Sequence, residues 1–179
     1  MNIAFDNGAD AGYRASAERA IERFWNNEGG NPPTYGECKC IVKFEVNTKG
    51  VQDCDRESSP EWHCIKVTPY ATKPPVDTGG KKYVGYMYPP GVSTKQNLTG
   101  WWSDGMDGPA PEGGNYEDFA HEAGHLMGLE DGDGGIMSNT SDPGPQPNQA
   151  LIDEIVRDVC KGEKCPDRCC CGNGIVEKE

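Results

Sequence analysis

Apolar residues recur with a helical period in three segments of the chain. In each segment they fall three or four positions apart, which places them on one face of a helix. The first segment covers residues 10–27 and stops at a Gly- and Pro-rich run, the second starts at Asn115, and the third covers residues 149–159. We therefore predict three helices. Their apolar faces consist of Ala17, Ala20, Ile21, Phe24 and Trp25; of Phe119, Ala123 and Leu126; and of Ile152, Ile155, Val156 and Val159.

Alternation of apolar and polar positions predicts short strands in the first half of the chain. The alternation is most regular over residues 40–46 and less clean in the other segments. Residues 89–114 are rich in Pro, Gly, Trp and Asp and show no periodicity, so we expect a long functional connection there. The predicted strands are 2–7, 40–46, 63–70 and 82–88.

The composition is acidic and poor in apolar residues. Only 35% of the 179 residues are apolar, and 29 acidic side chains against 17 basic ones give a net charge of −12. This charge argues against nucleic acid as a partner and disfavours binding to anionic membranes. No run approaches the roughly 18 consecutive apolar residues of a membrane span. We therefore expect neither nucleic-acid binding nor a membrane span.

Nine cysteines indicate an oxidising compartment, so we expect a secreted protein. An even group lies between positions 38 and 64, and it predicts two disulfides with three open connectivities. A second, odd group lies between positions 160 and 171, so at least one of its thiols is free or pairs outside the group. The first group is Cys38, Cys40, Cys54 and Cys64, and the second is Cys160, Cys165, Cys169, Cys170 and Cys171.

The second predicted helix carries the sequence His121-Glu122-Ala123-Gly124-His125. Histidines four positions apart lie one turn apart on the same helix face, so both imidazoles can reach one metal ion. Glu122 stands beside the first histidine, where it can act on a water bound to that ion. The competing interpretation is a solvated helix with two surface histidines. Because the chain has only three histidines and the apolar face excludes these two, we favour a zinc site.

The third ligand has to come from outside this helix, because catalytic zinc usually takes three protein ligands and leaves a fourth position for water. Gly128 lets the chain leave the helix and turn back, since glycine adopts positive φ at little cost. Asp131, three residues later, is our first choice for the third ligand. Glu130 and Asp133 are the alternatives, whereas His63 is more simply interpreted as a strand or loop residue.

The pattern His-Glu-x-x-His-x-x-Gly-x-x-Asp over residues 121–131, with Gly-Ile-Met-Ser downstream at 135–138, resembles the metzincin clan of zinc endopeptidases. An aspartate at the last position resembles the snapalysin type. The resemblance implies that Asp131 is the third ligand, that Glu122 is the general base, and that Met137 belongs to a tight turn beneath the metal. Three glycines between Asp131 and Met137 make such a turn sterically feasible.

The clan also implies a fold. We expect an α+β structure with a twisted mixed sheet, a backing helix and an active-site helix. A smaller lower half would hold the Met-turn and the C-terminal helix. The catalytic domain is then expected over residues 1–160. Residues 161–179 form a Cys-rich tail that resembles the start of a further Cys-rich module, and the signal or pro-segment that the clan implies is expected to have been removed.

These features together predict a secreted, monomeric zinc endopeptidase that acts on proteins or peptides. Zinc activates a water, and Glu122 accepts its proton and passes it to the leaving amine. The alternative is an adhesion or interaction module with a degenerate metal site and no hydrolytic activity. Calcium is a weaker expectation, because the Asp- and Gly-rich stretches at 104–108 and 131–135 lack the twelve-residue EF-hand pattern.

Overall fold

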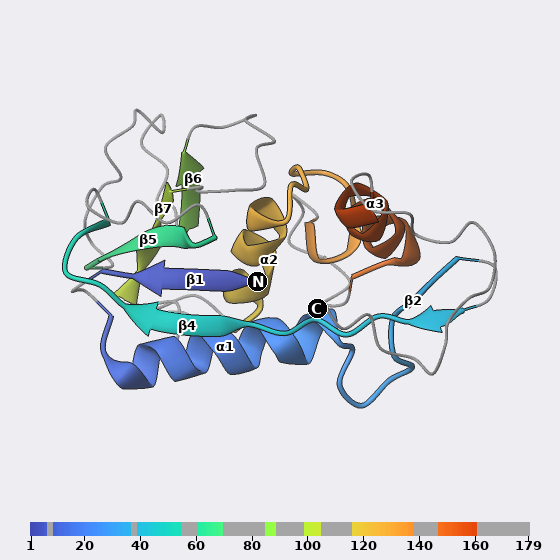
Figure 1. The fold of residues 1–179 in the computed structure, drawn as a ribbon, viewed down its shortest axis with the longest axis horizontal. Coiled ribbons are helices and arrows are strands. Elements are labelled where there is room, and N and C mark those ends of the chain that lie inside the picture. Colours follow the sequence, from blue (N-terminus) through green and yellow to red (C-terminus); the bar gives the residue numbers. More distant parts are fainter. Residues whose placement is uncertain are drawn as a thin grey trace.

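A computed structural model of the chain describes residues 1–6, 9–36, 39–54, 61–69, 85–88, 99–104, 116–137 and 147–160. Within these stretches the fold combines helices with a mostly parallel sheet, so the predicted α+β class is confirmed (Figure 1). The elements in chain order are β1 (Asn2–Phe5), α1 (Ala11–Trp25), β2 (Thr34–Tyr35), β3 (Cys40–Ile41), β4 (Asn47–Gly50), β5 (His63–Thr68), β6 (Gly85–Tyr88), β7 (Thr99–Ser103), α2 (Tyr116–Leu126), the 3-10 helix η3 (Gly135–Met137) and α3 (Gln149–Cys160).

The main sheet has five strands in the order β4-β1-β5-β7-β6. Strand β1 runs parallel to both β4 and β5, and β5 runs parallel to β7. Strand β6 pairs with β7 in the antiparallel sense at the edge, so the sheet is mixed, as predicted. The short strands β2 and β3 form a separate antiparallel pair, which lies at the other end of the view from β6 and β7 (Figure 1).

Helix α1 forms where Asp10 caps its first turn and an apolar stripe runs along one face. The Asp10 carboxylate accepts a hydrogen bond from the backbone N–H of Tyr13 at 2.8 Å, and Asn26 ends the helix. Every residue of the predicted stripe is buried. The helix lies along the sheet beneath β1 and β4 (Figure 1), so the prediction of a backing helix is confirmed.

The regular alternation over residues 40–46 does not form the predicted strand. Beyond β3, two side chains from the C-terminal end of α1 and its cap bond this backbone at Phe44 and Val46. Asn26 accepts from the Phe44 N–H and donates to the Phe44 carbonyl, both at 2.8 Å, and the Glu22 carboxylate accepts from the Val46 N–H at 2.9 Å. The periodicity predicted an extended chain with one face packed inward, and it could not reveal that side chains would replace a neighbouring strand.

The expected connection over residues 89–114 contains strand β7, so that prediction is wrong at this point. Strand β7 pairs with β5 on one side and β6 on the other, and its sequence Thr-Gly-Trp-Trp-Ser has no alternation to announce it. This strand forms because it pairs with a neighbour on each side, and its own sequence pattern does not predict it. The strands predicted at 2–7, 63–70 and 82–88 are found as β1, β5 and β6, each shorter within the described residues.

The other two predicted helices are present as α2 and α3. The predicted start of α2, Asn115, lies outside the described residues. Helix α3 has a cap that the sequence pattern did not indicate, because the side-chain oxygen of Asn148 accepts from the Leu151 N–H at 3.1 Å. Within the described stretches, no helix is long and apolar enough to cross a membrane.

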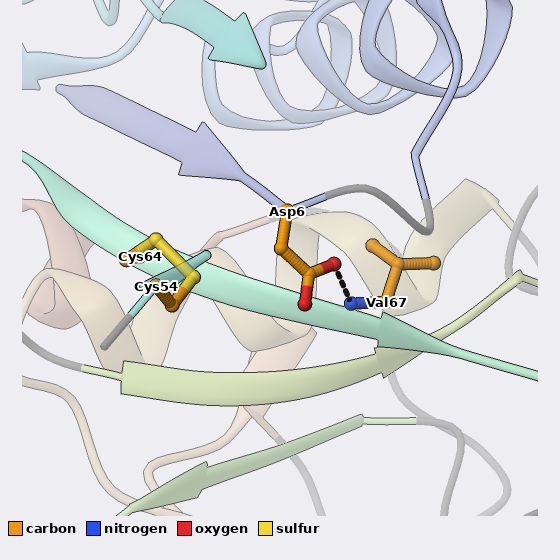
Figure 2. The surroundings of a disulfide bond; sticks show 4 residues. All are labelled: Asp6, Cys54, Cys64 and Val67. Atoms are coloured by element: carbon orange, nitrogen blue, oxygen red, sulfur yellow. Dashed lines mark hydrogen bonds between the residues drawn. A yellow bond between two sulfur atoms is a disulfide. The ribbon is translucent and has the colours of Figure 1, made fainter. Parts of the chain in front are cut away.

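A disulfide between Cys54 and Cys64 joins strand β5 to the segment that follows β4 (Figure 2). Cys40 is disulfide-bonded as well, to a partner outside the described side chains. Cys38 and the tail from residue 161 onward also lie outside the described residues. Near the Cys54–Cys64 bridge, Asp6 accepts a hydrogen bond from the Val67 N–H at 2.9 Å and ties the end of β1 to β5 (Figure 2).

Candidate metal centre

Helix α2 carries both candidate histidine ligands on the face that turns away from the core. Its apolar side is buried as predicted, with Phe119, Ala123 and Leu126 at most 1% exposed. The His121 and His125 rings lie one helical turn apart, with centroids 5.0 Å from each other and ring planes nearly perpendicular at 86°. The helix therefore presents two imidazoles together at the edge of the core.

The C-terminus of α2 fixes the ring of His125. Gly128 has a φ of 91°, its N–H donates to the His125 carbonyl at 3.0 Å, and the Leu129 N–H donates to the Gly124 carbonyl at 3.1 Å. This bonding is a Schellman cap, and the positive φ explains why glycine stands at this position. The cap also brings the Leu129 carbonyl to 2.9 Å from Nδ1 of His125. Gly128, which ends the helix, thus helps to orient His125, because the cap holds the Leu129 carbonyl against its ring.

The turn around η3 fixes the ring of His121 in the same way. The Gly132 N–H donates to the Met137 carbonyl at 2.8 Å, and the Met137 N–H donates to the Gly134 carbonyl at 3.0 Å. In this closed turn the Ile136 carbonyl lies 2.8 Å from Nδ1 of His121. A backbone carbonyl at each Nδ1 keeps the ring proton there in the neutral tautomer, so both Nε2 atoms present lone pairs.

Both Nε2 atoms face the same oxygen of Asp131. Oδ1 lies 3.2 Å from Nε2 of His121 and 3.3 Å from Nε2 of His125. Within the described stretches this is the one group of three such side chains whose ligand atoms lie close enough to share an ion, all within 4.8 Å of one another. Ligand atoms about 2.0–2.1 Å from a tetrahedral metal ion lie roughly 3.3 Å apart, so the two Nε2–Oδ1 separations are compatible with a shared ion of this size.

The electrostatics of the group also favour a cation. Two imidazole lone pairs and a carboxylate oxygen are all acceptors, and they repel one another unless a proton or a metal ion lies between them. The separations are longer than the roughly 2.7–2.9 Å of a charge-assisted N–H···O bond. Burial lowers the pKa of His125 below its ordinary value, which disfavours a proton there. The donor set therefore fits a divalent metal ion with nitrogen and oxygen ligands.

Glu122 is buried next to this group. It is 8% exposed, and its Oε2 has no hydrogen-bond partner in the part of the chain that the structure describes. Burial, with smaller contributions from Asp131 and Asp118, raises its pKa to about 8. A buried carboxylate oxygen without a partner is costly, and such atoms concentrate at functional sites. In the metal-free protein Glu122 is therefore mostly protonated at neutral pH.

The alternatives for the third ligand are placed differently. Oδ2 of Asp133 accepts from the Glu130 N–H at 2.9 Å, which closes the loop around Asp131, and Glu130 is exposed outside the group. His63 lies buried in β5, where burial lowers its pKa to about 4. Of the predicted candidates, the structure brings together His121, His125 and Asp131, with Glu122 beside them. The calcium stretch at 104–108 lies largely outside the described residues.

Met137 is fully buried in η3, which packs against α2. The contributions that the sequence pattern missed come from backbone atoms, namely the carbonyls of Ile136 and Leu129. Only Gly128 gave a signal for either of them, because a glycine directly after an apolar helical face indicates a cap.

Comparison of the chain with protein-family models and with curated proteins found no match. The argument for function therefore rests on the residues and their geometry.

Proposed function

We propose that this protein is a zinc-dependent endopeptidase of the metzincin type, in which His121, His125 and Asp131 hold the metal and Glu122 is the general base. The observation that carries the proposal is that the two Nε2 atoms lie 3.2 and 3.3 Å from one oxygen of Asp131, next to the buried Glu122, whose Oε2 has no hydrogen-bond partner among the described residues. The sequence pattern at 121–131 supplies the same residues in the same roles.

Each residue has a distinct task in this mechanism. When bound, zinc supplies an activated water and polarises the carbonyl of the scissile bond. Glu122 takes a proton at Oε2 during the attack and returns it to the leaving amine. The carbonyls of Ile136 and Leu129 keep the histidines in the tautomer that offers Nε2. Asp131 adds a negative charge that a third imidazole would not.

The compartment and the partners belong to the same proposal. A buried disulfide between Cys54 and Cys64 supports an oxidising, extracellular setting. The substrates are proteins or peptides, since the chemistry of the site is that of peptide-bond hydrolysis. We further propose that the chain acts as a monomer.

The test is the variant Glu122→Gln, which keeps the shape of the side chain and removes the base. We expect about one zinc per chain in both wild type and variant. Hydrolysis of an unstructured protein such as casein should fall by a factor of about 10²–10⁴ in the variant, because a general base contributes on that order. Chelation should abolish the wild-type activity, and added zinc should restore it.

The matched control is Glu117→Gln, which removes a carboxylate from the first turn of the same helix. It should keep the wild-type rate. An undiminished rate in Glu122→Gln would refute the mechanism. Bound zinc without hydrolysis of any unstructured protein would instead favour a metal-binding interaction module.

A further inference from the structure

The backbone of helix α2 approaches two side chains from other elements at Gly124, between the two histidines. A Cβ atom built at Gly124 would collide with Sδ of Met137. It would also lie 3.1 Å from Cε of Met137 and 3.3 Å from Cζ2 of Trp25. Any side chain larger than hydrogen would displace one of these groups. Gly124 is therefore the point at which η3, α1 and α2 meet.

Trp25 contacts α2 at a second point, one turn away. Its indole N–H donates to the Ala120 carbonyl at 2.9 Å, in the buried interior. The side chain is fully buried, and its ring packs against Phe44, with centroids 5.4 Å apart. Ala120 directly precedes His121, so the indole holds the backbone on both sides of the first histidine.

We propose that Trp25 is a positioning residue of the metal centre, which sets the rotation and height of α2 so that both histidines face Asp131. This inference rests on the proposed function of the site. The metal ligands lie on two separate elements, since α2 carries the histidines and the following loop carries Asp131. A small rotation of α2 about its axis would move both Nε2 atoms off the shared point, because successive residues project about 100° apart around the helix.

Trp25 and Met137 restrict that rotation from two elements. Met137 belongs to the turn whose Ile136 carbonyl orients His121, and it contacts α2 at Gly124. Trp25 contacts the same glycine and adds a directional hydrogen bond at Ala120. Partners behind the ligands of a metal typically change its affinity by 10–100-fold. An indole of α1 that bonds the backbone next to His121 is expected to act in this range.

The test compares Trp25→Phe with Trp102→Phe. Both variants lose a fully buried indole, and Trp102 also contacts α2, but it does so through the ring of Phe119. At Gly124 and Ala120 the indole in contact is that of Trp25. We measure zinc affinity by competition with a chelator, the visible spectrum of the Co²⁺-loaded protein, and the melting temperature. Trp25→Phe should lower zinc affinity about tenfold and change the Co²⁺ spectrum. Trp102→Phe should lower the melting temperature and leave both metal readouts at wild-type values.

Wild-type zinc affinity and Co²⁺ spectrum in folded Trp25→Phe would overturn the inference, as would equal losses in both variants. A second variant covers the case in which Trp25→Phe does not fold. Benzothienylalanine at position 25 keeps the two-ring shape without the N–H, and it too should change the Co²⁺ spectrum; an unchanged spectrum would overturn the role of the hydrogen bond to Ala120. Failure of the proposed function is a separate result, because it appears as absent zinc or absent hydrolysis in the wild-type protein.

Discussion

The two histidines and Asp131 meet at one point, but they are held in opposite ways. The imidazoles are 24% and 19% exposed, they belong to a helix, and each Nδ1 lies against a backbone carbonyl. The Asp131 side chain is 55% exposed and belongs to a loop between glycines of positive φ, Gly128 and Gly132. The two histidines are thus held in place by a helix and by backbone carbonyls, whereas Asp131 reaches the centre from an exposed loop.

This difference predicts that the histidines and Asp131 contribute unequally to the affinity for the metal. A group already fixed by packing and hydrogen bonds loses little freedom when it binds, whereas an exposed loop side chain must be ordered at that moment. The histidine side should therefore provide most of the affinity. Asp131 should contribute less to the affinity, because water can reach an exposed position and replace a lost carboxylate there.

The largest expected effect comes from removing a histidine. We expect His121→Ala or His125→Ala to weaken zinc binding by about 1,000-fold, or ~4 kcal/mol, which is one ligand's share of the free energy of a four-ligand zinc site. Zinc content after dialysis and competition with a chelator measure this loss. The control is His63→Gln, which alters the remaining histidine in β5 and should leave zinc affinity unchanged. Retention of zinc by either alanine variant would exclude that histidine as a ligand.

The second effect concerns the buried acid on the histidine side. The pKa of Glu122 is about 8 in the folded, metal-free protein and about 4.5 in the unfolded chain. Between these pH values the folded protein keeps a proton that the unfolded chain has released, so stability falls as pH rises from about 4.5 to about 8. Glutamine cannot ionise. Metal-free Glu122→Gln should therefore exceed the stability of wild type above pH 8 by several kcal/mol.

Thermal unfolding with chelator between pH 4.5 and pH 9 measures this difference. The two proteins should converge at the acid end of the range. Glu117→Gln, in the first turn of the same helix, should follow wild type throughout. A constant difference between Glu122→Gln and wild type at every pH would contradict the raised pKa of Glu122.

The sequence was sufficient to predict the buried faces of α1 and α2. The stripes of α1 and α2 depend only on local spacing, and a Gly after an apolar helical face predicts a cap. Strand β7 and the bonding of Phe44 were not predictable, because both depend on a partner distant in the chain. A strand paired on both sides needs no alternation, and an extended segment can be bonded by a helix side chain such as Asn26.

The same limit applies to the candidate site. The spacing of His121, Glu122 and His125 follows from helix geometry; all three lie on α2, and the two imidazole rings lie one turn apart. For the third ligand, spacing left Glu130 and Asp133 open beside Asp131. The choice depends on the path of a short loop, in which the Asp133 carboxylate bonds to the Glu130 N–H and so faces its own backbone. Periodicity carries no information on such a bond.

The smallest expected effect comes from the exposed side. Asp131→Ala should lower zinc affinity about tenfold, far less than either histidine variant, because the loop must be ordered to bring this carboxylate in and water can take its place. Chelator competition measures all variants on one scale. Asp133→Asn keeps an acceptor for the Glu130 N–H and serves as the control, with affinity expected within about twofold of wild type. A loss in Asp131→Ala as large as that in His121→Ala would show that the exposed loop is as well organised as the helix. Full affinity in Asp131→Ala, with a loss in Glu130→Ala or Asp133→Ala, would move the third ligand to that residue.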